Sequence, residues 1–139
     1  MRWRQGGLRH LAALVLAALT ALTGAAAAAP LEAWIDKSDQ QMTVYLDYRP
    51  VYRWPVSTAR SGKETPNGTF RPQSLQRMHY STLYDNAPMP FSIFFSGDYA
   101  IHGTTETRHL GHPASAGCIR LSPAHAEILF NLVRQIGLD

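Results

Sequence analysis

The chain has one cysteine, Cys118, and it lies in the run Ser115-Ala116-Gly117-Cys118-Ile119-Arg120-Leu121. The pair His102-Gly103 stands upstream of it. Because the chain begins with a predicted export signal, its folded part is expected to meet an oxidising compartment, where a thiol without a disulfide partner in its own chain is a liability. A thiol kept there, between a glycine and an arginine, indicates chemistry rather than packing.

The chemistry that these residue types predict is nucleophilic catalysis by Cys118. A thiolate attacks where a thiol does not, so His102 is the expected base and would form a thiolate–imidazolium pair with the cysteine. Arg120 adds positive potential, and backbone N–H groups around Gly117 are positioned to approach an oxyanion. Gly103 allows unusual backbone dihedral angles, and its carbonyl is expected to hold the second ring nitrogen of His102.

Residues 1–28 have the three regions of a secretory signal peptide. Arg2, Arg4 and Arg9 come first, an apolar stretch follows from residue 11 to 22, and small residues lead to a predicted cleavage after Ala28. The stretch is short and alanine-rich for the alternative, a membrane anchor. We therefore expect a periplasmic or otherwise extracytoplasmic protein.

Net charge gives no reason to expect a nucleic-acid partner. The whole chain carries 13 Lys and Arg against 10 Asp and Glu, and three of the basic residues but none of the acidic ones fall in the predicted signal. The remainder is balanced in charge and long enough for one modest domain, which we place at residues 31–139.

The mature part is predicted to be mainly β, a sandwich or curled sheet, with one C-terminal helix. Segments rich in β-branched and aromatic residues indicate strands, at 33–36, 42–46, 51–56, 91–95 and 99–102. Residues 47–50 predict a hairpin turn, 61–68 an exposed loop, and 103–117 a loop across the mouth of a sheet. His102 then lies at a strand end.

Ser122 and Pro123 are suited to begin the C-terminal helix, as its cap and its first residue. An apolar stripe at helical spacing follows and is expected to contact the core: Ala126, Leu129, Phe130, Val133 and Ile136.

Over residues 31–136 the chain resembles the YkuD-type L,D-transpeptidase catalytic domain, a family of cysteine enzymes that act on bacterial peptidoglycan. The resemblance rests on His102-Gly103, on the run Ser115 to Leu121, and on several flanking segments in the same order. Those segments are 55–58, 65–70 (Thr-Pro-Asn-Gly-Thr-Phe), 89–95 and 122–126. The implied fold is the β-sandwich-like catalytic fold of that family, with a C-terminal helix.

The resemblance implies that Cys118 attacks the carbonyl of the diamino acid at the third position of a tetrapeptide stem, with D-Ala leaving and His102 carrying the proton. The acyl group then passes to an amine of another stem, of an envelope protein or of a free D-amino acid. No metal and no organic cofactor is implied, and carbapenem-type inhibitors are expected to acylate the enzyme. The resemblance also implies that the substrate or the oxyanion lies near Ser115, Gly117 and Arg120. For Tyr84 and Met89 we expect core packing rather than a place in the lining of the donor cleft.

The chain departs from the family pattern at Ala116, where the family has a second histidine two residues before the cysteine. The minimal Cys118–His102 pair is intact without it. His109 or His112 can compensate if the loop brings one of them near the thiol, but we favour exposed loop histidines for both.

Two other functions stay open. One is a zinc site made by Cys118 with His102, His109, His112 and His125. The other is a non-catalytic peptidoglycan-binding module of the same fold, inactivated at Ala116.

Overall fold

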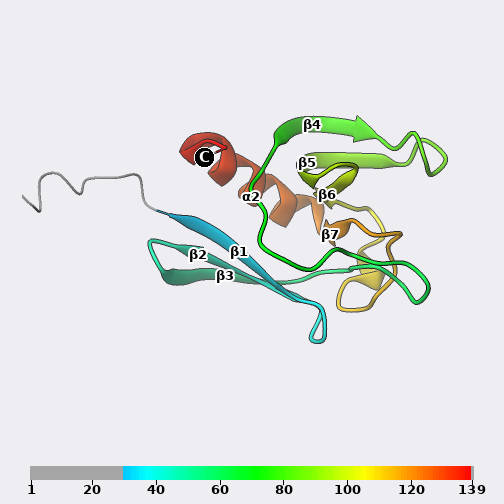
Figure 1. The fold of residues 1–139 in the computed structure, drawn as a ribbon, viewed down its shortest axis with the longest axis horizontal. Helices are drawn as coiled ribbons and strands as arrows, with labels where there is room; N and C mark the ends of the chain where they lie inside the picture. Colours follow the sequence, from blue (N-terminus) through cyan, green and yellow to red (C-terminus); the bar gives the residue numbers. More distant parts are fainter. Residues whose placement is uncertain (1–29, 139) are drawn as a thin grey trace, which may run out of the picture.

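The structure is a computed structural model that describes residues 30–138. The predicted signal peptide lies outside the described residues. The elements form two sheets and one long helix (Figure 1). Their bounds are β1 Leu31–Asp36, β2 Gln41–Leu46, β3 Arg49–Pro55, β4 Ser74–Tyr80, β5 Pro88–Ser96, β6 Tyr99–Gly103, the 3-10 turn η1 Thr107–His109, β7 Ile119–Leu121 and α2 Pro123–Ile136. The predicted mainly β fold with a C-terminal helix is confirmed.

The first sheet is the antiparallel meander β1-β2-β3. Burial alternates along β1 and β2, so that Met42 and Val44 of β2 are buried while Thr43 between them faces outward. Asp47 and Tyr48 make the β2–β3 turn with φ of 52° and 63°, the left-handed conformation that a tight hairpin requires. The predicted hairpin is therefore present.

The second sheet has the order β4-β5-β6-β7, with β7 parallel to β6. Two of its strands were not predicted. β4 has the sequence SLQRMHY, which contains no β-branched residue and is mostly exposed because the strand lies at an edge. β7 has three residues, too few to show a pattern.

One residue of β5 with a left-handed backbone conformation changes which side chains lie on the outer face of the second sheet. Phe91 has a φ of 53° within the strand. Met89 and Phe94 lie an odd number of positions apart, and strict alternation would send them to opposite faces. They nevertheless share one buried cluster with Ala100, against which Cys118 packs.

Helix α2 begins as the sequence predicts. The Ser122 side chain accepts a hydrogen bond from the His125 N–H at 3.2 Å, and Pro123 occupies the first helical position. The helix lies between the two sheets in Figure 1 and contributes Ala126, Leu129, Phe130 and Val133 to a core that it shares with β2, β3, β5, β6 and β7. Ile136 at the end of the stripe is only partly buried. No helix within residues 30–138 is long and apolar enough to cross a membrane.

The chain after β3 joins the two sheets. Ser57 and Arg120 exchange backbone hydrogen bonds of 2.9 and 3.1 Å, and Ala59 forms a parallel bridge with Ser115. β7 is thus hydrogen-bonded to β6 on one edge and to Ser57 on the other.

Candidate active site

The parallel pairing of β6 with β7 brings Cys118 and His102 to the same face of the second sheet. His102 is paired with Arg120, so Cys118, directly before β7, falls beside Ala100. Alternate residues of a strand share a face. The side chains of Ala100 and His102 therefore lie on one face with those of Cys118 and Arg120, while Ile101 and Ile119 point into the core. The position of His102 near the end of a strand is as predicted.

His102 is buried, with 5% of its surface exposed, and its Nδ1–H donates to the Gly103 carbonyl at 2.7 Å. Burial lowers the pKa of His102 to about 4, because a charged imidazolium is costly to desolvate, and the positive charges of Arg120 and His79 lower it further. The hydrogen bond to Gly103 acts in the opposite direction without outweighing burial. The ring is therefore neutral near pH 7.

Cys118 is partly buried, and burial raises the pKa of its thiol. A backbone hydrogen bond from Ala100 and the charge of Arg120 lower this pKa without overcoming burial, while the charge of Asp98 raises it. The thiol lies 3.8 Å from the Asp98 carbonyl oxygen. Both shifts disfavour the predicted thiolate–imidazolium pair in the resting site, because burial opposes a charge on either group.

Arg120 lies beside His102 across the β6–β7 pairing, and its charge is partly balanced. Its guanidinium is 3.6 Å from the Glu106 carboxylate, and the same carboxylate is 3.3 Å from Nδ1 of His109. Glu106 thus moderates the positive potential that the sequence alone assigns to Arg120.

Gly103 is a glycine for a reason other than the predicted one. It is absent from the described residues with positive φ. A Cβ at this position would lie 3.1 Å from Pro123 Cα and 3.2 Å from Pro90 Cγ. Close approach of Pro123 and Pro90, and not an unusual dihedral angle, therefore leaves little room for a side chain there.

Ser115 organises the turn that leads into the cysteine. Its buried hydroxyl donates to the Cys118 carbonyl at 2.6 Å and accepts from the Gly117 N–H at 3.0 Å. The Gly117 N–H is used within the loop, which corrects its predicted place among the oxyanion donors. The prediction of a donor near 117–118 then rests on the Cys118 N–H.

Gly117 cannot carry a side chain in this loop. Its φ is 146°, and a Cβ would lie 2.6 Å from Cε1 of Tyr99 and 3.0 Å from the Glu64 carbonyl oxygen. The glycine before the cysteine therefore lets the Tyr99 ring pack across the loop.

Thr65 supports the loop before Cys118, which sequence reasoning missed. The segment 61–68 was expected to be an exposed loop, but Thr65 is 4% exposed. Its hydroxyl donates to the Gly117 carbonyl at 2.8 Å and accepts from the Ala59 N–H at 3.0 Å. The turn-forming composition around Thr65 concealed it, and only its place in the Thr-Pro-Asn-Gly segment of the family resemblance marked it out.

A family comparison agrees with this geometry. The model of the YkuD L,D-transpeptidase catalytic domain matches residues 30–136. The chain belongs to the L,D-transpeptidase catalytic domain family. No curated protein matches it.

Solved L,D-transpeptidases share the fold. An L,D-transpeptidase from Mycobacterium smegmatis is similar with a TM-score of 0.70 and 21% identity, over 75% of this chain and 54% of that one. An L,D-transpeptidase from Xylanimonas cellulosilytica has a TM-score of 0.66 and 27% identity, over 82% and 58%. L,D-transpeptidase 3 from Mycobacterium tuberculosis, in complex with a faropenem-derived adduct, has a TM-score of 0.66 and 21% identity, over 74% of this chain and 56% of that one. This chain spans little more than half the length of these structures.

Side chains of β4 and β5 form the surroundings of Cys118, which packs against the cluster that contains Met89 and Phe94. Met89 is buried as expected, whereas Tyr84 is 45% exposed and is not a core residue. Its ring centroid lies 6.0 Å from Nζ of Lys63, which joins the β4–β5 loop to the loop after β3. His79, which no sequence pattern indicated, sets its ring edge-on against Phe94 at 5.0 Å.

His109, His112 and His125 were the other candidate zinc ligands. Within residues 30–138 no three His, Cys, Asp or Glu side chains lie close enough together to hold a metal ion. His125 stacks on Trp54 at 4.7 Å, and His109 is tied to Glu106. His112 is exposed, as favoured from the sequence, while His109 is half-buried.

Proposed function

We propose that the chain is a peptidoglycan L,D-transpeptidase that uses Cys118 as nucleophile and His102 as base. The observation that carries the proposal is the shared face of these two residues, with the His102 ring oriented by the Gly103 carbonyl. An oriented neutral imidazole beside a thiol is the minimal arrangement for acyl transfer through a thioester.

The neutral resting pair requires the proton to move as the sulfur attacks. Nε2 of His102 takes the thiol proton while Sγ bonds to the carbonyl carbon of the third-position diamino acid, and the negative charge develops on the carbonyl oxygen. The C–N bond to D-Ala then breaks, and His102 returns the proton to the leaving amine. An acceptor amine attacks the thioester carbonyl, and His102 takes the proton of the amine. The C–S bond then breaks, and His102 returns that proton to the sulfur, which restores the thiol.

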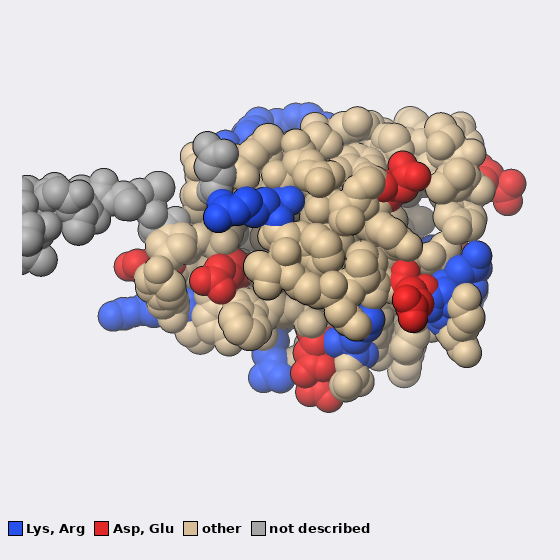
Figure 2. Space-filling model, viewed as in Figure 1, with Lys and Arg blue, Asp and Glu red and all other residues tan. Residues whose placement is uncertain are grey.

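We propose a tetrapeptide stem as donor and an amine of a second stem or of an envelope protein as acceptor. Exchange of one amide for another needs no cofactor. On the face drawn in Figure 2, Lys and Arg are interspersed with Asp and Glu and form no patch of one sign, so this face offers no extended basic surface for a nucleic acid. Residues 1–28 would direct the enzyme to the periplasm or another extracytoplasmic space.

Imipenem tests this function, because a solved L,D-transpeptidase is described in complex with that drug. Attack by Cys118 on its β-lactam carbonyl would open the ring and leave the whole drug on the protein. Intact mass spectrometry should show one adduct on the wild-type chain and none on Cys118→Ala. A folded wild-type chain without an adduct would favour the non-catalytic binding module. If the adduct forms on Cys118, mass analysis of peptidoglycan incubated with the chain would identify the cross-link.

A further inference from the structure

A large aromatic side chain is exposed on the outer face of the first sheet, away from the core and from the cysteine. Trp34 of β1 is 63% exposed. It does not stand alone, because the Tyr45 ring from β2 meets it edge-on at 6.1 Å and Thr43 is its cross-strand partner. One exposed ring is common on protein surfaces, so a ligand site at Trp34 depends on what surrounds the ring.

The indole is held in place without any ligand. Its Nε1–H donates to Oε2 of Glu32, two residues earlier on the same face, at 2.8 Å. Tyr45 packs edge-on against the same ring. A platform fixed in advance loses little conformational freedom when something stacks on it.

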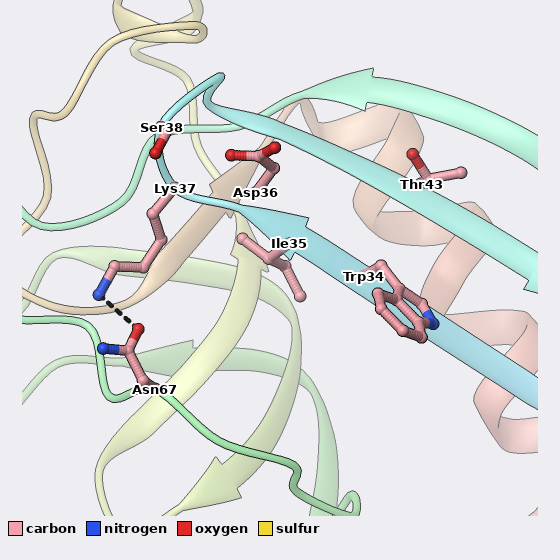
Figure 3. A pocket seen from close by; sticks show the side chains of 7 residues that line it. All are labelled: Trp34, Ile35, Asp36, Lys37, Ser38, Thr43 and Asn67. Carbon is pink, nitrogen blue, oxygen red and sulfur yellow. Dashed lines mark hydrogen bonds between the residues drawn. The ribbon is translucent and has the colours of Figure 1, made fainter.

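A shallow hollow of about 560 Å³, open to solvent, lies next to Trp34 (Figure 3). Its polar lining comes from Asp36, Lys37, Ser38, Thr43 and Asn67. Oδ1 of Asp36 accepts from the Asp39 N–H at 3.0 Å, and Nζ of Lys37 donates to Asn67 and to the Thr65 carbonyl at 2.9 and 2.8 Å. Three more polar groups on the rim can accept or donate hydrogen bonds: the second carboxylate oxygen of Asp36, the Thr43 hydroxyl and the Asn67 amide group.

This combination selects a ligand with one apolar face and a hydroxylated edge. The C–H groups of a pyranose ring carry small positive charges and pack on the negative face of an indole, while its hydroxyls need both donors and acceptors around the rim. The Glu32 and Asp36 carboxylates disfavour a phosphate or another polyanion, and Lys37 is already engaged. The charge pattern therefore suits a neutral sugar.

We propose that the outer face of the first sheet binds the glycan strand of peptidoglycan, with one sugar ring stacked on Trp34 and its polar groups bonded to Asp36, Thr43 and Asn67. The choice of this glycan among polysaccharides rests on the proposed function. The site itself rests on the first sheet and includes no residue of the Cys118 face.

The test is titration of the full chain, carrying Cys118→Ala, with the N-acetylglucosamine tetramer, followed by ¹H–¹⁵N NMR. The indole N–H of Trp34 and the amides of Asp36 and Thr43 should shift together. Trp34→Ala should weaken binding at least tenfold, and Thr43→Val several-fold. Tyr48→Ala, an exposed aromatic at the other end of the sheet, should bind as the parent does.

Absence of shifts at millimolar sugar, or undiminished binding by Trp34→Ala, would overturn the site. Equal binding of maltotetraose, which lacks acetamido groups, would overturn its assignment to peptidoglycan. Imipenem acylation of a Trp34→Ala chain that keeps Cys118 should proceed at the wild-type rate. If the tetramer binds but imipenem leaves the wild-type chain unmodified, the proposed function fails while the glycan site stands.

Discussion

The Nδ1–H of His102 donates to the carbonyl oxygen of Gly103 at 2.7 Å. A carbonyl oxygen only accepts hydrogen bonds, so the proton of the neutral ring lies on Nδ1 and Nε2 carries the free lone pair. The backbone thus fixes the tautomer, as a carboxylate or amide side chain does in other catalytic triads.

Replacing this base should slow acylation without unfolding the chain. For His102→Asn we expect the rate of imipenem acylation to fall by about 10²–10⁴-fold, the usual contribution of a positioned base. Time-resolved intact mass spectrometry measures it, with circular dichroism to check the fold. His112→Asn, a change in an exposed loop, is the control. A His102→Asn rate within a few-fold of wild type would exclude His102 as the base.

The pH dependence of thiol alkylation should reveal the resting state of the pair. The pKa of Cys118 is raised and that of His102 is lowered to about 4. An ion pair is therefore disfavoured, and the rate of iodoacetamide alkylation should rise with pH through the neutral range and beyond pH 9. Cys118→Ala provides the blank. A plateau between pH 5 and 8 would instead demonstrate a stable thiolate–imidazolium pair.

Restoring the family histidine at Ala116 should increase thiolate reactivity. In Ala116→His, a protonated imidazole two residues before Cys118 would lower the pKa of the thiol and raise its alkylation rate at pH 7 several-fold. Ala116→Gln adds a side chain of similar reach without a charge and should leave the profile unchanged. If both variants behave alike, the missing histidine is not what tunes this thiol.

Gly117→Ala should cost both stability and activity. The new Cβ would collide with the Tyr99 ring and with the Glu64 carbonyl, in addition to the strained φ, so we expect a loss of about 1–3 kcal/mol in the free energy of unfolding. Gly62→Ala separates the two causes, because Gly62 also has a positive φ but a Cβ there would meet no atom within 4 Å. Urea unfolding measures both variants, and equal losses would refute the steric explanation.

The sequence predicted the strands whose patterns are strong. β1, β2, β3, β5 and β6 contain the runs of β-branched and aromatic residues that predicted them, and α2 follows helical apolar spacing, with Ser122 and Pro123 marking its start. β4 was missed because an edge strand buries little and needs few β-branched residues. β7 was missed because its strand character comes from β6 and Ser57, which are distant in sequence.

The site was predicted in its members but not in its electrostatics. Cys118, His102 and the Gly103 carbonyl were named from residue type and spacing, and the structure brings them together. Their protonation states depend on burial, which no local pattern reveals. Thr65 was hidden for the same reason, since its hydrogen bond to Gly117 joins segments 52 residues apart.

The three-residue strand β7 also links catalysis to folding. It holds β6 on one side and Ser57 on the other, and Cys118 directly precedes it. An intermediate in which β7 has not docked would leave the two sheets unjoined and the thiol far from its base. Such an intermediate would also expose that thiol to oxidation. The pairing of β7 therefore joins the two sheets and places Cys118 on the face that carries His102.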